Sequence, residues 1–121
     1  MSEKIKIHKS VNGGSAKWVA QRISAIALIP LFMWLILSIL LVIKNPAANL
    51  PAYFSHPFNV IAVIIFIFAA LYHSTIGICE VLEDYVSCKA KRHFYMILVK
   101  FISAISGVAA FLAVFKLHFL L

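Results

Sequence analysis

Three apolar stretches, each long enough to cross a lipid bilayer, dominate the pattern of hydrophobic and polar positions along the chain. They cover residues 23–43, 58–81 and 94–117, and polar or basic residues flank each of them. A helix needs about 20 apolar residues to span the hydrocarbon layer, so the pattern predicts three transmembrane helices. Pro30 lies about two turns into the first stretch and predicts a bend there.

The segments between these stretches are short and polar. Residues 1–17 are basic and interrupted by two adjacent glycines, which predicts a mobile cytoplasmic tail. Residues 44–57 contain three prolines and predict a loop on the outer side, and residues 82–93 predict an inner loop. The first apolar stretch is longer than the roughly 7–15 residues of a secretory signal, so we expect no cleaved signal. We therefore expect residues 1–121 to form a single membrane-anchor domain.

Composition sets the class of protein. The 121 residues are 64% hydrophobic and 12% charged, and the mean hydropathy is +1.01. So few polar side chains cannot cover a soluble surface, which predicts an all-α membrane protein. The net charge of +7 does not indicate a nucleic-acid partner, because the basic residues sit beside apolar spans instead of forming a stripe on a folded domain.

The distribution of basic residues predicts the orientation. Five of them precede the first span, one follows it, three follow the second and one lies at the end of the third: Lys4, Lys6, Lys9, Lys17 and Arg22; Lys44; Lys89, Lys91 and Arg92; Lys116. Short loops rich in Lys and Arg stay on the cytoplasmic side. We therefore expect the amino terminus to be cytoplasmic and the carboxyl terminus to lie on the outer side.

One stripe on the second span carries most of the candidate chemistry. At about 100° per residue, Gly77, Glu80 and Asp84 lie within about 40° of His73 around a helix. Asp84 is about 16 Å further along the axis. The stripe thus places an imidazole inside the bilayer and a carboxylate near the water, and intramembrane ionisable residues commonly mark functional sites.

His73 permits two interpretations. A buried imidazole can ligate a metal cofactor, and the small residues Ala69 and Gly77, one turn away on either side, would let a flat macrocycle approach. The alternative is a histidine hydrogen-bonded to a Ser, Thr or carbonyl group of a neighbouring helix, with the small residues serving close helix packing. Both interpretations stay open on the residues alone.

The remaining histidines and the cysteines limit what the chain could bind by itself. The other histidines lie in the tail, in the outer loop and at helix boundaries: His8, His56, His93 and His118. None is at the depth of His73, so a haem there would need its second axial ligand from another polypeptide. Cys79 and Cys88 do not form a C-x-x-C-H motif for covalent haem, and we expect both to be reduced and structural.

A polar cluster ends the second span, where Glu80, Glu83, Asp84 and Tyr85 follow one another closely. It could be an ordinary interfacial helix end, with solvated acids and a tyrosine in the aromatic belt. It could also form a pocket in which the phenol donates a hydrogen bond to a quinone carbonyl and a carboxylate relays protons. Arg22 and Ser24 of the first span are expected at the same depth.

Two stretches resemble the small cytochrome b subunit of respiratory complex II, the hydrophobic membrane anchor of succinate dehydrogenase. One is W-x-x-Q-R-I-S-A-I-A from Trp18 to Ala27, and the other is H-x-x-x-G-x-x-x-V-x-x-D-Y from His73 to Tyr85. The second, with its spacing from histidine to Asp-Tyr, is the more specific. Three spans in the predicted orientation agree with the family layout.

The resemblance implies roles for individual residues. His73 matches the axial ligand that binds the iron of haem b. The other axial ligand would come from a second cytochrome b subunit. Tyr85 matches the tyrosine that hydrogen-bonds ubiquinone, and Asp84 matches the acid beside it. Arg22, with Ser24 at the same depth, is assigned to the haem propionate or quinone pocket. The family offers no role for Lys100 or Cys79.

The resemblance also implies the partners and the activity. A flavoprotein subunit would oxidise succinate, an iron-sulfur subunit would pass the electrons on, and this chain would help to reduce the quinone without a complete active site of its own. The lysine-rich start favours a bacterial inner membrane over a mitochondrial one. The alternatives are the anchor of a fumarate reductase, a small transporter or channel subunit and, as the weakest, a structural assembly factor.

Overall fold

The computed structural model describes the backbone of residues 2–120 and the side chains of residues 15–120, and its regular secondary structure in that part of the chain is entirely helical. The helices are α1 (Ser2–Val42), α2 (Pro46–Ser55), α3 (Pro57–Tyr85) and α4 (Lys89–Phe119). α1, α3 and α4 are long and apolar enough to cross a membrane. The prediction of an all-helical membrane protein with three spanning helices is confirmed.

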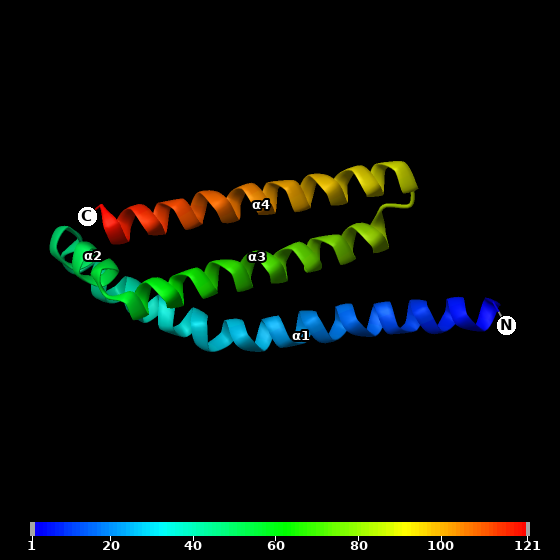
Figure 1. Ribbon diagram of the computed structural model, residues 1–121, viewed down its shortest axis with the longest axis horizontal. Helices are drawn as coiled ribbons and strands as arrows, with labels where there is room; N and C mark the ends of the chain where they lie inside the picture. The colour runs from blue at the N-terminus through cyan, green and yellow to red at the C-terminus, as the bar shows by residue number, and fades with distance from the viewer. Residues whose placement is uncertain (1, 121) are drawn as a thin grey trace.

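The three long helices lie side by side, with α3 between α1 and α4 (Figure 1). α2 lies at one end of the bundle, next to the end of α4. The link between α3 and α4 lies at the other end, near the start of α1. The two chain ends are therefore at opposite ends of the bundle, as three crossings require. Which side of the membrane each end faces stays a prediction.

Pro30 lies inside α1, and the helix continues past it. Figure 1 shows α1 curving in its cyan stretch, near this residue. A proline removes one backbone donor and crowds the preceding turn, which explains a bend at this place.

The helices extend beyond the predicted spans. Residues 15–17 are helical in α1, where the sequence predicts part of a mobile tail, and the side chains of residues 1–14 lie outside the described residues. Only residues 86–88 separate α3 from α4, so the predicted inner loop of residues 82–93 is mostly helix. Hydropathy marks only the part of a helix that crosses hydrocarbon, whereas backbone hydrogen bonding continues through polar helix-forming residues such as Glu83.

Residues 44–57, the predicted outer loop, are not irregular throughout, because they contain α2. Its prolines begin helices instead of breaking them. Pro46 is the first residue of α2 and Pro57 the first of α3, positions where the missing N–H would have no intrahelical partner anyway.

α2 closes its end of the bundle. Phe54, Val60 and Val114, from α2, α3 and α4, are buried together there. Hydrogen bonds connect α2 to each long helix: Asn49 Nδ2 donates to the Leu41 carbonyl at 2.9 Å, Asn59 Nδ2 donates to the Tyr53 carbonyl at 3.1 Å, and His118 Nδ1 donates to the Phe54 carbonyl at 2.7 Å. A small packed cap thus closes the end of the bundle where α2 lies.

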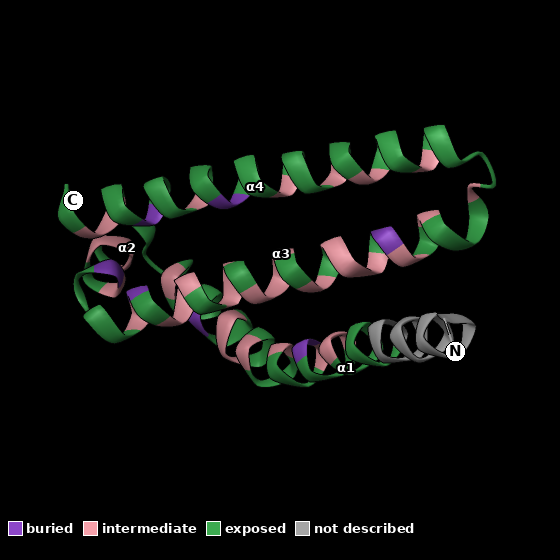
Figure 2. Ribbon diagram, turned by 45° about the vertical axis from the view of Figure 1, so that its right-hand side comes forward, coloured by how far each residue is buried: buried purple, intermediate pink, exposed green. Residues whose placement is uncertain are grey.

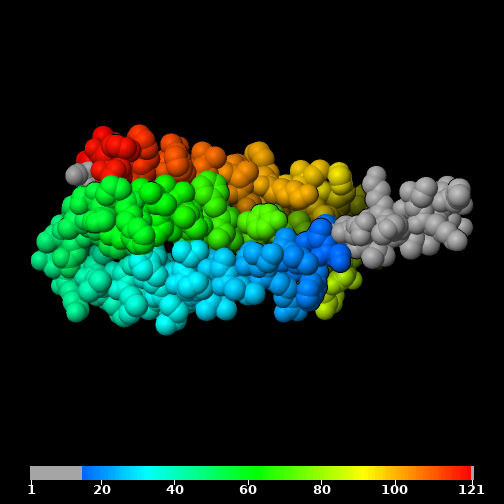
Figure 3. Space-filling view, turned by 60° about the horizontal axis from the view of Figure 1, so that its bottom comes forward, coloured from blue at the N-terminus to red at the C-terminus, as the bar shows by residue number. Residues whose placement is uncertain are grey.

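Most other apolar side chains point outward. Figure 2 shows buried positions as isolated patches on the helices, and Figure 3 shows an elongated molecule. Large residues such as Ile26, Phe58 and Phe101 are each more than 60% exposed. An apolar surface this extensive needs lipid or other subunits to cover it.

Candidate functional site

His73 lies on α3 and makes a hydrogen bond to α1. Its Nδ1 is 2.9 Å from the hydroxyl oxygen of Ser24. Ser24 is buried, with 8% of its surface exposed, and His73 is half-buried. The structure therefore brings together two of the predicted site residues, although they lie 49 positions apart in the chain.

A second hydrogen bond of Ser24 favours one tautomer of His73. The Ser24 hydroxyl donates its single proton to the Gln21 carbonyl at 3.0 Å. While it donates to Gln21, the same hydroxyl can only accept from His73, and this arrangement favours the tautomer in which Nδ1 carries the ring proton and Nε2 keeps its lone pair. Nε2 has no hydrogen-bond partner among the described residues and is not enclosed by them. The ring thus presents an unprotonated nitrogen at the surface of the chain.

This arrangement fits an axial haem ligand. Histidines that bind metals usually donate a hydrogen bond from the nitrogen that does not bind the metal, which fixes the orientation of the ring and raises its basicity. Of the two interpretations, the structure shows the alternative one, a histidine hydrogen-bonded to a serine of a neighbouring helix. The two are compatible because the imidazole uses one nitrogen for each.

The expected role of Gly77 needs correction. A Cβ atom at Gly77 would lie only 3.2 Å from Gln21 Nε2. The space in front of this glycine is thus filled by a side chain of α1 and is not open to a macrocycle. Gly77 serves the close packing of α1 against α3, which is the second of the two interpretations above.

The residues predicted for the quinone site lie apart from His73. Asp84 and Tyr85 are the last two residues of α3. Tyr85 is about 18 Å from His73 along the helix axis. Both residues are exposed, and 84% of the surface of Tyr85 is accessible to solvent in the isolated chain. Arg22 is also exposed and stacks on the Trp18 ring, with 5.2 Å between its guanidinium carbon and the ring centroid. The described part of the chain shows no hydrogen bond or ion pair between Arg22 and Asp84 or Tyr85.

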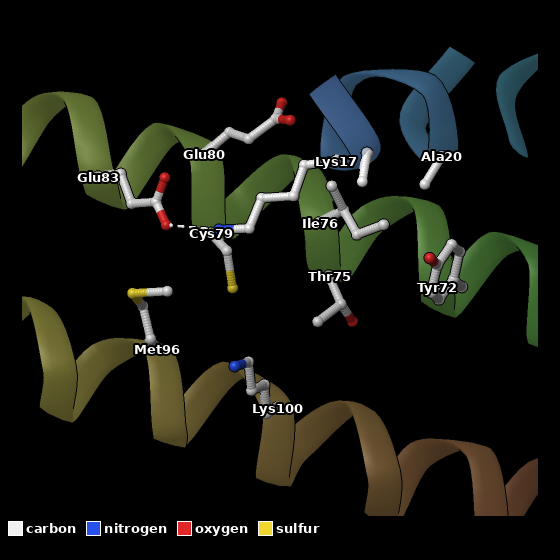
Figure 4. A pocket seen from close by; sticks show the side chains of 11 residues that line it. Lys17, Ala20, Tyr72, Thr75, Ile76, Cys79, Glu80, Glu83, Met96 and Lys100 are labelled. Atoms are coloured by element: carbon white, nitrogen blue, oxygen red, sulfur yellow. Dashed lines mark hydrogen bonds and ion pairs between the residues drawn. The ribbon is translucent and has the colours of Figure 1, made fainter. Parts of the chain in front are cut away.

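An ion pair joins α1 to α3 near this end. Lys17 Nζ lies 3.1 Å from Glu83 Oε1, and the two side chains are 57% and 40% exposed. Beside it is a cavity of about 340 Å³ between the three long helices, shown in Figure 4. Glu80, the buried Cys79 and Lys100 of α4 also line it. The sequence does not predict this cavity, because its lining comes from three helices and no local sequence pattern shows how they pack.

Family comparison gives these observations their context. The sequence model of the family described as "Succinate dehydrogenase/Fumarate reductase transmembrane subunit" matches residues 2–115. The chain belongs to this family. The resemblance found in the sequence is therefore confirmed.

Individual relatives of the family agree. The protein named "Succinate dehydrogenase hydrophobic membrane anchor subunit" of Rickettsia bellii is 39% identical over 116 residues, which cover 91% of this chain and 92% of the relative. Proteins of the same name from Rickettsia felis and Rickettsia conorii are each 35% identical, and the matched regions cover 93% of this chain in both cases. They cover 93% and 94% of the two relatives. No solved structure is significantly similar to the chain.

The hydrogen bond between Ser24 and His73 connects the two stretches that carry the family resemblance. One stretch is Trp18 to Ala27 on α1, and the other is His73 to Tyr85 on α3. The other histidines with described side chains do not approach His73: His56 and His93 are exposed near helix starts, and His118 is bonded to α2. Cys79 is buried and Cys88 is exposed, and neither is in a disulfide among the described residues.

Proposed function

We propose that this chain is the membrane anchor subunit of a succinate dehydrogenase, with His73 as one axial ligand of haem b and the end of α3 as part of the ubiquinone-reduction site. The family match and the names of its rickettsial relatives support the first part. The single observation that carries the second is the hydrogen bond from His73 Nδ1 to Ser24.

Ser24 and Gln21 prepare His73 for iron. The Ser24 hydroxyl donates a hydrogen bond to the Gln21 carbonyl and accepts one from His73 Nδ1. The lone pair of Nε2 is then free to bind the haem iron. Haem b, when bound, supplies a one-electron carrier to the complex. The second axial ligand comes from a partner cytochrome b subunit, because this chain holds no other histidine at that depth among its described side chains.

Tyr85 and Asp84 act at the quinone. The exposed phenol of Tyr85 is free to donate a hydrogen bond to a quinone carbonyl, and the exposed carboxylate of Asp84 is positioned to pass protons from water as the quinone is reduced. Arg22 and the Lys17–Glu83 ion pair supply charge at the same end. A pocket completed by partner subunits would explain why Tyr85 is so exposed in the isolated chain.

The proposed setting is a bacterial inner membrane. The end with Lys17 and Tyr85 faces the cytoplasm, where the iron-sulfur and flavoprotein subunits dock, and α2 lies on the outer side. The second cytochrome b subunit and the bilayer cover the exposed apolar surface of the long helices.

Absorption spectra of the assembled complex test the ligand assignment. The wild-type complex should show a reduced b-type spectrum that His73→Ala abolishes or alters. His93→Ala is the matched control, since it removes an exposed histidine of α4 and should leave the spectrum unchanged. An unchanged spectrum and haem content in His73→Ala would remove this part of the proposal.

The direction of the reaction separates the main alternative, an anchor of fumarate reductase. The family description covers both enzymes, while the names of the relatives favour succinate oxidation. Membranes should therefore reduce ubiquinone with succinate faster than they reduce fumarate with a quinol. The opposite ratio would favour fumarate reductase and leave the assignment of His73 intact.

A further inference from the structure

A continuous groove runs between α3 and α4. The cavity of about 340 Å³ beside the Lys17–Glu83 ion pair adjoins a second cavity of about 580 Å³ that extends toward the middle of the helices. Tyr72, Thr75 and Lys100 line both. The two cavities are therefore two parts of one binding space.

The chemistry of this groove changes along its length. At the junction are the ammonium group of Lys100 and the hydroxyl groups of Tyr72, Thr75 and Ser103, and Thr75 Oγ1 donates to Ser103 Oγ at 2.8 Å. Further from the Lys17 end the lining is apolar, ending at Val108 and Phe111. The order is thus charge, then hydroxyl groups, then hydrocarbon.

Lys100 is the unusual residue in this series. It lies within the spanning helix α4, and Figure 4 shows its side chain in the gap between α3 and α4. The ion pair found among the described residues joins Lys17 to Glu83 and leaves Lys100 out. A cation at membrane depth is costly unless an anion or a polar group accompanies it.

The groove is long enough for an acyl chain. Lys100 and Phe111 are eleven positions apart on α4, about 16 Å along the helix, and Lys100 lies about 9 Å inside the predicted span that begins at residue 94. Gly107 forms the floor of the apolar part, where α4 lies so close to α3 that a Cβ atom would be 3.3 Å from Leu71 Cδ1.

We propose that this groove binds one phospholipid of the leaflet on the Lys17 side, with its phosphate at Lys100 and one acyl chain running to Phe111. The hydroxyl groups of Tyr72 and Ser103 donate to the ester carbonyls next to the phosphate. A quinone is the weaker occupant because its neutral ring gives Lys100 no counter-charge. The site does not depend on haem or on His73, which lies at the contact of α3 with α1.

Lipid retention by the assembled complex tests this site. The complex is purified in mild detergent, and the phospholipid bound per complex is measured by native mass spectrometry. Lys100→Gln and Ala104→Phe, which remove the charge and fill the groove, should each lose one phospholipid that the wild type and Lys100→Arg retain. The matched controls are Lys91→Gln and Ala109→Phe, because both residues are exposed on α4 and line neither cavity.

Three results would overturn the proposal: equal lipid retention in all these variants, a quinone mass in place of the lipid, or no bound lipid in the wild type. A density map of the wild-type complex gives a second measurement that needs no variant. It should show a continuous chain of density in the groove from Lys100 to Phe111. Side chains of a partner subunit in that space would contradict a lipid site.

Discussion

Ser24 of α1 and His73 of α3 form a hydrogen bond of 2.9 Å between the first two spanning helices. The bond orients the imidazole, and the second hydrogen bond from Ser24 to the Gln21 carbonyl favours the tautomer with a proton on Nδ1. In that tautomer Nε2 is available, as the proposed haem ligation requires. Ser24 is a positioning residue in this arrangement, since it acts on the proposed haem through His73.

Removing the Ser24 hydroxyl should weaken haem binding without removing the ligand. In Ser24→Ala we expect haem retention to fall by about 10- to 100-fold, the usual cost of losing a hydrogen-bond partner of a metal ligand. We also expect a shift of the haem midpoint potential, measured by redox titration of the b-type spectrum in the assembled complex.

Ser24→Thr is the control, because it keeps a hydroxyl group at the same place. It should restore both the haem content and the potential to near the wild-type values. If Ser24→Ala retained the wild-type potential while assembling normally, the bond would have no role in tuning the haem.

Gly77 should tolerate a small side chain better than a large one. A Cβ atom there meets the end of the flexible Gln21 side chain at 3.2 Å, so Gly77→Ala requires only that Gln21 move. Gly77→Leu would push α1 from α3, with an overpacking cost of about 1–3 kcal/mol and a longer Ser24–His73 distance. Thermal melting of the complex and its haem content should both decrease.

Combining Gly77→Ala with Gln21→Ala tests the contact directly. The double variant should be more stable than the sum of the two single effects predicts, because shortening Gln21 makes room for the new methyl group. Simple additivity would mean that the two residues do not meet in the assembled complex.

The spanning helices could be predicted from the sequence because hydropathy alone distinguishes residues that cross a bilayer. α2 was missed for a different reason. Pro46, Pro51 and Pro57 predict a loop, yet a proline at the first position of a helix costs little, and Pro46 and Pro57 stand at such positions. Helix ends were misplaced because polar residues such as Glu83 continue a helix past the hydrocarbon.

The site was only partly accessible from the sequence. The periodicity of α3 places His73 and Asp84 on one stripe, but no pattern says which residue of α1 faces the histidine. Ser24 was expected at the level of the quinone residues, and the structure places it against His73 instead. The contact depends on the register between α1 and α3, in which Gln21 also lies against Gly77.

Tyr85→Phe should separate quinone reduction from assembly. The Tyr85 side chain is 84% exposed, so losing its hydroxyl leaves the packing of the chain intact. One neutral hydrogen bond is worth about 0.5–1.5 kcal/mol, so we expect ubiquinone reduction by succinate to slow about 2- to 10-fold. Reduction of an artificial dye should be unchanged, and Tyr95→Phe, on the exposed side of α4, should leave both rates unchanged.

Tyr53→Phe should leave the cap around α2 intact or strengthen it. The Tyr53 ring packs between Trp34 and Phe54, with centroids 6.1 Å and 5.3 Å away, and phenylalanine preserves both contacts. The phenol oxygen is enclosed and makes no hydrogen bond of good geometry among the described residues, with the Ser38 hydroxyl as its polar neighbour. Burial raises the pKa of this phenol above its ordinary value, and Ser38 offsets part of that rise. Removing an enclosed polar group that lacks a partner avoids a desolvation cost of about 1–3 kcal/mol. The thermal midpoint of the complex should therefore stay equal or rise at neutral pH, and a clear decrease would indicate that the hydroxyl binds a water molecule or a partner subunit.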